Sequence, residues 1–120
     1  MPLESDRRSK RRIIVGADHT IQFIVKGHPF LNVRITNLSI DGCFATVHRG
    51  EVRLFTSGAI LENLMFEHPD LPPGAITARV SYALGDQAHG EVMEFMGLGI
   101  QFIATPPETL ALLQIWVDTH

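Results

Sequence analysis

Two short groups of polar residues in this 120-residue chain have types and spacings that could bind an anionic ligand. Near the N-terminus, Arg8 and Arg12 are four residues apart, and Arg7 and Arg11 repeat that spacing one residue earlier. An arginine presents a planar fork of N–H donors that binds phosphate or the O6/N7 edge of guanine with two hydrogen bonds, and it also stacks on base faces. Two arginines on one short segment could therefore clasp an anionic purine from one side.

The second group is an Asn-x-Ser-x-x-Gly pattern formed by Asn37, Ser39 and Gly42, with Asp41 inside it. Asn37 and Ser39 are two residues apart at the end of an expected strand, so their side chains should point to the same side. The amide offers both donors and an acceptor, and the hydroxyl offers either role. Gly42 allows a positive φ, or the approach of a ligand to backbone that carries no Cβ. We expect a small polar patch that can read the edge of a base.

The charge of the chain is distributed unevenly. Residues 1–12 contain five basic and two acidic residues, a net charge of +3, whereas residues 13–120 contain five basic and eleven acidic residues, a net charge of −6. This concentration of positive charge indicates an anionic partner for residues 1–12, which we expect to form a flexible arm. The acidic remainder argues against a nucleic-acid-binding protein.

Several classes of protein are disfavoured by the composition. No apolar stretch is long enough for a transmembrane helix, and no secretory signal is visible, so we expect no membrane insertion. The single cysteine, Cys43, excludes an internal disulfide and a cysteine-rich zinc site, favours a reducing, cytoplasmic location, and should be a buried apolar residue. No histidine has another three or four residues away, so we expect no metal site, although distant histidines could still meet in space. No catalytic constellation is present, and we expect no enzyme.

The hydrophobic pattern predicts an all-β domain with one helix at its C-terminus. Strands are expected over residues 19–26, 31–38, 43–47, 59–66, 75–84 and 92–104, with 13–15 as a further β segment and no clear period in 48–57. Glycines at positions 97 and 99 inside the last strand indicate a bulge or the close approach of another backbone. In the strand over 75–84, Tyr82 is expected on the same face as Ile76, Ala78 and Val80.

The C-terminal segment changes to a helical period. Thr105 is expected to cap a helix over about residues 105–118, with Pro106 in its first position and an apolar face formed by Leu110, Leu113, Trp116 and Val117. Short strands separated by frequent turn signals favour a small antiparallel barrel over a sandwich, because closure removes exposed edges. We therefore predict a six- to seven-stranded antiparallel β-barrel over residues 13–120, preceded by the basic arm.

The order and spacing of the two polar groups resemble the paired motif of the PilZ domain family. Arg-x-x-x-Arg precedes Asn-x-Ser-x-x-Gly by about 25 residues, and the strand that begins at Gly99 resembles the glycine-then-aromatic strand that closes the PilZ barrel. The resemblance implies a bacterial receptor for the second messenger cyclic di-GMP that signals through a conformational change to a downstream protein. It assigns ligand binding to Arg7, Arg8, Arg12, Asn37, Ser39 and Gly42, with Arg11, Asp41 and Gly99 as further candidates.

Two points stay open within this resemblance. The two overlapping arginine pairs leave the register of the first motif undecided, although Arg8 and Arg12 fit best because Arg12 directly precedes the first β segment. A basic residue before the first motif arginine, here Arg7, is associated in the family with an intercalated dimer of the ligand, which would give two cyclic di-GMP per chain instead of one. The alternative function is a PilZ-like protein-interaction module that does not bind nucleotide.

Overall fold

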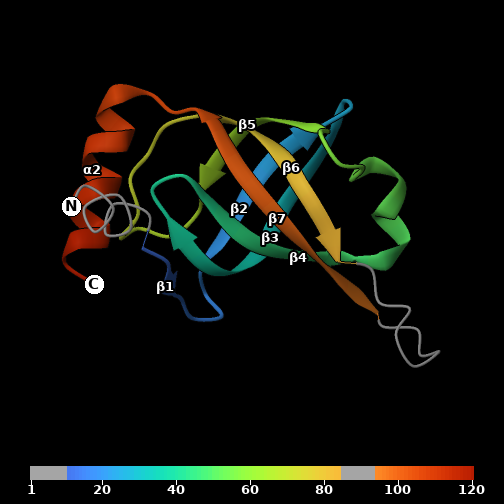
Figure 1. Cartoon of the computed structure of the whole chain (residues 1–120), viewed down its shortest axis with the longest axis horizontal. Helices are drawn as coiled ribbons and strands as arrows, with labels where there is room; N and C mark the ends of the chain where they lie inside the picture. The colour runs from blue at the N-terminus through green and yellow to red at the C-terminus, as the bar shows by residue number, and fades with distance from the viewer. Residues whose placement is uncertain (1–10, 85–93) are drawn as a thin grey trace, which may run out of the picture.

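Seven strands and a C-terminal helix form the body of the protein in the computed structural model, which describes residues 11–84 and 94–120 (Figure 1). The elements, in chain order, are β1 (Ile13–Ile14), β2 (Thr20–Val25), β3 (His28–Ser39), β4 (Gly42–His48), the 3-10 helix η1 (Arg49–Leu54), β5 (Ile60–Phe66), β6 (Ile76–Leu84), β7 (Phe95–Ala104) and α2 (Pro107–Asp118). The expected strands are thus present, and the ambiguous segment 48–57 contains a short 3-10 helix.

The strands form a closed antiparallel barrel. Hydrogen bonding runs in the order β1-β3-β2-β5-β6-β7-β4, and the additional pairing of β3 with β4 closes β2 to β7 into a six-stranded ring. The short strand β1 is added outside that ring, along β3. Alternate residues point inward, as in β2, where Ile21, Phe23 and Val25 are buried. The predicted fold class is confirmed.

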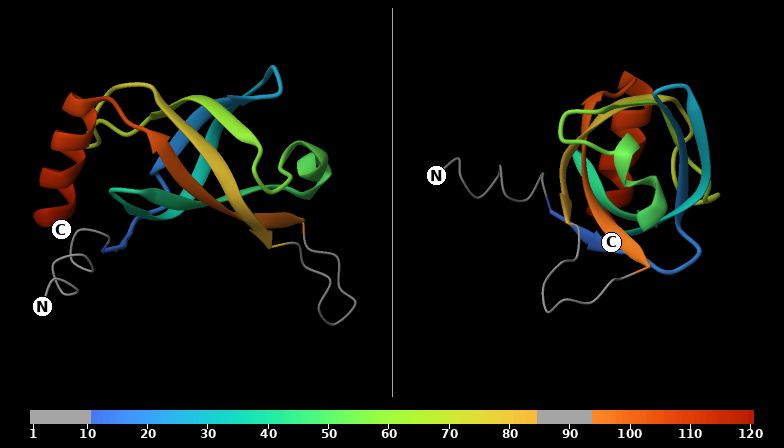
Figure 2. Two further views of the ribbon diagram at one scale, coloured as in Figure 1. Left: turned by 45° about the horizontal axis from the view of Figure 1, so that its top comes forward. Right: turned by 90° about the vertical axis from the view of Figure 1, so that its right-hand side faces the viewer.

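The two ends of the barrel are covered by different elements, as Figures 1 and 2 show. At one end, Phe55 follows η1 and packs its ring edge-on against Phe23 and Phe30, with ring centroids 6.0 and 5.2 Å apart respectively. At the other end lies α2, which buries Leu113, Trp116 and Val117. Each fully buried side chain of this kind contributes about 1.5–3 kcal/mol to folding.

The start of α2 differs from the sequence prediction. The capping position is Pro106, not Thr105, and Pro107 is the first helical residue. No side chain caps this end. Leu110, expected on the buried face, is 40% exposed, whereas Thr109 is buried and its hydroxyl donates a 2.8 Å hydrogen bond to the carbonyl of Pro73. The buried face runs through Thr109, Leu113 and Trp116. A polar contact to the loop before β6 therefore takes the place assigned to a leucine.

Strand β3 is also less regular than its alternating sequence suggests. Alternation along the strand would place Leu31, Val33 and Ile35 on one face; Val33 and Ile35 are buried, but Leu31 is exposed. Asn32 has a φ of 57°, a left-handed conformation that turns the chain between Leu31 and Val33 and breaks the alternation. The turn before β3 is formed by Lys26 and Gly27, both with positive φ, a pattern typical of a tight hairpin.

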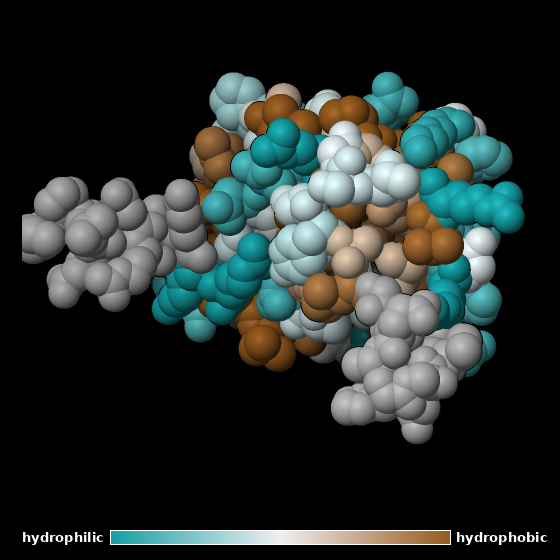
Figure 3. Space-filling view, turned by 45° about the vertical axis from the view of Figure 1, so that its right-hand side comes forward, coloured by the Kyte–Doolittle hydropathy of each residue, from teal (hydrophilic) through white to brown (hydrophobic). Residues whose placement is uncertain are grey.

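Apolar side chains also reach the surface between hydrophilic ones (Figure 3). Among them are Leu84 and Phe95, which lie at the ends of β6 and β7 and are 56% and 54% exposed. No helix within the described residues is long and apolar enough to cross a membrane. Three predicted features lie outside the described residues: positions 1–10 of the expected arm, the loop over 85–90 and the start of the strand at residue 92.

Candidate functional site

Strand β1 carries Arg12 to the second polar group. Ile13 pairs with Leu38 and Ile14 with Asn37, so the residue just before β1 lies beside the end of β3. This pairing is short, and its apolar anchor is Ile13, which is partly buried against the core. Local strand pairing thus brings together two motifs that are 25 residues apart in the sequence.

Arg12 and Asn37 are joined directly. The Arg12 guanidinium donates a 2.7 Å hydrogen bond from Nη1 to Oδ1 of Asn37, and this contact lies at the surface. Because the amide oxygen of Asn37 accepts this hydrogen bond, the Nδ2 group remains as a pair of N–H donors for a ligand. The remaining N–H groups of Arg12 are also donors, so this corner of the site suits an acceptor-rich or anionic ligand.

The turn after β3 is organised by a buried hydroxyl. Ser39 is completely buried, and its Oγ lies 2.5 Å from Oδ1 of Asp41 and 3.3 Å from the carbonyl oxygen of Gly42. The backbone N–H of Asp41 donates to the same Oγ at 3.3 Å. These contacts hold the carboxylate of Asp41 in place. Ser39 therefore fixes the geometry of the turn. Its hydroxyl was expected in a polar patch that reads a base, but it is buried and not available to a ligand.

Two glycines are required by close contacts around β7. A Cβ on Gly42 would lie 2.2 Å from the carbonyl oxygen of Ile100, so a side chain there would push β4 away from β7. A Cβ on Gly99 would lie 2.2 Å from the ring of Tyr82. The expected close approach at Gly99 therefore exists, but the approaching group is an aromatic ring and not a backbone.

Tyr82 lies outside the barrel, although it was expected on the same face of β6 as Ile76, Ala78 and Val80. The β6–β7 register shifts between Val80 and Tyr82, and this irregularity moves the tyrosine out of the alternation. Its side chain is 47% exposed and covers Gly99, with the ring of Phe44 6.3 Å away across β7. The result is an aromatic surface beside the polar turn.

These elements surround a shallow hollow of about 190 Å³ on the outer face of the barrel. Its lining residues come from the segment before β1, the β3–β4 turn, β6 and β7: Arg12, Asp41, Ser81, Tyr82, Gly99, Ile100 and Gln101. A second hollow of about 340 Å³ shares Ser81 and Gln101 and extends along β6 to Arg79, whose Nε donates to Oε1 of Gln101 at 2.9 Å. Together they form a polar shelf, which we call the β6–β7 shelf.

The other residues assigned from the sequence have different positions. The guanidinium of Arg11 contacts the backbone carbonyl of Val117 near the end of α2, so it points away from the shelf. Asn37 does not line the shelf itself but is hydrogen-bonded to Arg12, which does. Neither Ser39 nor Gly42 lines the shelf. Arg7 and Arg8 lie outside the described residues.

Cys43 is the first residue after the turn glycine and is buried in the core. Burial raises the pKa of its thiol from the ordinary value of 9.0 to about 12, and the positive charge of Arg12 opposes this shift only in part. A protonated, buried thiol is a poor nucleophile. The expectation that Cys43 is a buried apolar residue is confirmed.

Comparison with solved structures identifies the fold. No family model matches the sequence, and no curated protein sequence is significantly similar to it. The PilZ domain of YcgR from Escherichia coli with c-di-GMP superposes with a TM-score of 0.72 at 16% identity, covering 94% of this chain and 90% of that one. The chain has the fold of a PilZ domain.

Other similar structures contain this PilZ fold as part of a longer chain. The K. pneumonia MrkH–c-di-GMP complex matches with a TM-score of 0.75 at 18% identity over 94% of this chain. The Borreliella burgdorferi PlzA protein in complex with c-di-GMP matches with a TM-score of 0.58 at 11% identity over 96%. The chain spans about half the length of both, 52% and 53% respectively.

Sequence analysis missed four residues that this PilZ fold places around the shelf. These residues, all on β6 or β7, are Arg79, Ser81, Tyr82 and Gln101. Alternation along a strand indicates which residues face outward, but not which outward-facing residues line the same hollow. Gly99 was the one sequence feature that pointed to this hollow, because a glycine on the outer face of a strand leaves space that a neighbouring aromatic ring can occupy.

Proposed function

We propose that this protein is a bacterial cyclic di-GMP receptor. The observation that carries the proposal is the hydrogen bond from Arg12 to Asn37, which joins the two motifs of the family resemblance at one edge of the β6–β7 shelf. The similar structures of YcgR, MrkH and PlzA are each described with c-di-GMP.

The chemistry of the shelf matches the parts of a guanine dinucleotide. The Arg12 guanidinium can bind a phosphate or the O6/N7 edge of guanine with two N–H groups. The Asp41 carboxylate can accept hydrogen bonds from the N1–H and N2–H groups of the same base. The exposed ring of Tyr82 offers a surface on which a base can stack, a contact worth about 1–3 kcal/mol.

The N-terminal arm completes the site in this proposal. Ligand pockets for small molecules usually have volumes of about 300–1,000 Å³, whereas the hollow at Arg12 measures about 190 Å³. A dinucleotide on this shelf would keep one side open to water, and the basic residues before Arg12 are the groups available to cover it. The register Arg8–Arg12 is preferred over Arg7–Arg11, because Arg11 points to α2.

Ligand binding would cost conformational entropy in the arm. Ordering each residue costs about 1–2 kcal/mol, and the charge-assisted hydrogen bonds of Arg8 and Arg12, at about 1.5–3 kcal/mol each, together with base stacking would have to offset this. Because phosphate contacts are screened by salt, affinity should fall as ionic strength rises. If Arg7 supports an intercalated dimer, the stoichiometry is two ligands per chain.

The receptor is proposed to act through another protein and not as an enzyme. The arm and the β3–β4 turn would change on binding, and a downstream partner would recognise the result. The single, buried and protonated Cys43 fits a reducing compartment, so we place the receptor in the bacterial cytoplasm.

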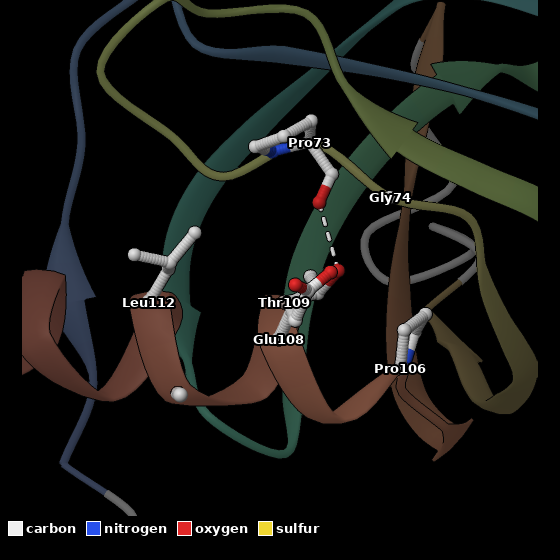
Figure 4. A pocket seen from close by; sticks show the side chains of 7 residues that line it. Pro73, Gly74, Pro106, Glu108, Thr109 and Leu112 are labelled. Atoms are coloured by element: carbon white, nitrogen blue, oxygen red, sulfur yellow. Dashed lines mark hydrogen bonds between the residues drawn. The ribbon is translucent and has the colours of Figure 1, made fainter.

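The alternative is a PilZ-like interaction module without nucleotide, and one observation favours it. A cavity of about 580 Å³ lies between α2 and the loop before β6, lined by Pro73, Gly74 and Leu112 among others (Figure 4). Leu112 and Ile115 beside it are 47% and 59% exposed. A partner protein could bury these side chains whether or not the shelf holds a ligand.

Equilibrium titration separates the two functions. Purified protein is titrated with cyclic di-GMP, with GTP and cyclic AMP as controls, and the heat of binding gives both affinity and stoichiometry. Saturable binding of cyclic di-GMP that is lost in Arg12→Ala supports the receptor. Absence of binding to the wild-type protein at micromolar ligand supports the interaction module.

A further inference from the structure

A cluster of metal-binding side chains lies away from the β6–β7 shelf. Asp18 and His19 end the turn between β1 and β2, and His68 follows β5. Ile21 pairs with Phe66 across the β2–β5 ladder, and the backbone N–H of Glu67 donates to the carbonyl of Thr20 at 3.0 Å. Continuing that register by one pair places His19 opposite His68. The two histidines that sequence spacing could not connect are therefore held together by strand pairing.

The side chains of this cluster converge on one point. The two imidazole rings stack with centroids 3.9 Å apart. The Asp18 carboxylate lies across them, with Oδ1 3.1 Å from Nδ1 of His19 and Oδ2 3.3 Å from Nε2 of His68. Both histidine side chains are largely buried, at 16% and 13% exposure, whereas that of Asp18 is 75% exposed. The cluster thus has ordered nitrogen donors on the protein side and an open side toward water.

We propose that Asp18, His19 and His68 form a binding site for one divalent transition-metal ion of the zinc class. Two imidazole nitrogens and a carboxylate oxygen are a donor set that such ions accept, with water in the fourth position. Bonds of about 2.0–2.1 Å to a tetrahedral ion place its donors about 3.4 Å apart. Oδ1 of Asp18 is already this close to Nδ1 of His19, at 3.1 Å, and Oδ2 to Nε2 of His68, at 3.3 Å. With one donor atom taken from each residue, all three donors lie within 4.8 Å of one another, so small side-chain movements would bring them around one ion.

Binding requires movements of side chains only. The two rings are nearly parallel, at 6°, and coordination in the plane of each ring requires them to tilt toward a shared ion. The neighbouring Glu67 is not part of the donor set, because its carboxylate accepts hydrogen bonds from the Thr20 hydroxyl at 2.6 Å and the Asn32 backbone at 3.1 Å.

Asp70 is a positioning residue for His68. Its backbone N–H donates to Nδ1 of His68 at 3.1 Å, so in the metal-free protein the proton of the neutral ring is on Nε2. Coordination through Nε2 requires the tautomer with the proton on Nδ1, so the hydrogen bond from the Asp70 N–H is given up. The Asp70 carboxylate, with Oδ2 4.0 Å from Nδ1, is then the acceptor for that proton, an arrangement typical of metal-bound histidine.

Calorimetric titration of the full chain with zinc chloride in chelator-free buffer tests the site. We expect one tightly bound equivalent for the wild-type protein, at least tenfold weaker binding in His19→Ala and His68→Ala, and no comparable binding of magnesium chloride. The matched control is His28→Ala, which removes an exposed histidine from the start of β3 and should bind zinc like the wild type. Equal binding by all four proteins, or none by the wild type, would overturn the proposal.

Three further measurements test the site even if a histidine variant unfolds. Asp18→Asn changes an exposed side chain, so it should fold and still weaken zinc binding. In the wild-type protein, zinc should shift the imidazole NMR signals of His19 and His68 and leave those of His28 and His48 unchanged. Zinc should also raise the unfolding temperature in a concentration-dependent way, because it binds the folded state. Shifts at His28 or His48 instead would contradict the assignment.

Discussion

The guanidinium of Arg12 donates a 2.7 Å hydrogen bond to the side-chain oxygen of Asn37, a residue 25 positions later. The bond joins the segment before β1 to the end of β3 and leaves N–H donors of both side chains available at the edge of the β6–β7 shelf. If this pair binds cyclic di-GMP as a unit, the two residues should not contribute independently.

A double-mutant cycle tests that coupling. We expect Arg12→Ala and Asn37→Ala each to weaken cyclic di-GMP binding at least tenfold, because each removes one partner of a charge-assisted network. The fold-loss of cyclic di-GMP affinity in the double variant should be clearly smaller than the product of the fold-losses in the two single variants. Arg53→Ala, at an exposed arginine in η1, is the matched control and should bind like the wild type. Fully independent losses would contradict the coupled pair.

The two glycines beside β7 should respond differently to alanine. Gly42→Ala places a Cβ 2.2 Å from the backbone oxygen of Ile100, so β4 and β7 must separate, and we expect a stability loss at the upper end of the about 1–3 kcal/mol typical of overpacking. In Gly99→Ala the nearest atoms to the new Cβ belong to the ring of Tyr82, which can swing into solvent. This substitution should therefore cost less stability while weakening ligand binding. Urea unfolding and ligand titration of both variants measure the two effects, and equal stability losses would argue against this distinction.

Tyr82 provides a separate test of the shelf. Removing its ring in Tyr82→Ala should weaken cyclic di-GMP binding by about 5- to 150-fold, because base–aromatic stacking contributes about 1–3 kcal/mol. Tyr82→Phe keeps the ring and should bind nearly as well as the wild type. The side chain is 47% exposed, so both variants should stay folded by circular dichroism. Unchanged affinity in Tyr82→Ala would remove this residue from the site.

The buried thiol of Cys43 should make the stability of the fold depend on pH. Its pKa is raised from 9.0 to about 12 by burial, so the folded state disfavours the thiolate. This contribution to stability is fully present below about pH 9 and should be lost as pH rises from 9 toward 12. The native protein should also react slowly with thiol reagents near pH 8 and rapidly once unfolded. A slope of stability with pH in that window that persists in Cys43→Ala, or fast labelling of the native thiol, would contradict this explanation.

The sequence predicted the strands because the apolar alternation reflects burial directly, as in β2 with Ile21, Phe23 and Val25. It did not predict where that alternation breaks. The positive φ of Asn32 and the register shift before Tyr82 depend on how neighbouring strands pair, which local patterns do not contain. For the same reason the simple alternation fails at Leu31 and at Tyr82, whose side chains are exposed.

The candidate site was predictable where residue chemistry and spacing coincide. Arg12 and Asn37 were both assigned from their motifs, and the pairing of β1 with β3 brings them into contact. Ser39 was assigned from its motif, but its burial, which makes it a support for Asp41, depends on the closed turn. The His19–His68 pair follows from the β2–β5 register, and that register is a tertiary property.

The most direct test of the central claim is the equilibrium binding of cyclic di-GMP to the purified chain and to Arg12→Ala, measured by calorimetry with GTP and cyclic AMP as controls. The proposed receptor predicts saturable binding of cyclic di-GMP, one or two molecules per chain, with at least a tenfold loss in Arg12→Ala and no comparable binding of the other nucleotides. A wild-type protein that does not bind cyclic di-GMP at micromolar concentrations, or an Arg12→Ala variant that binds it equally well, would contradict the proposed function.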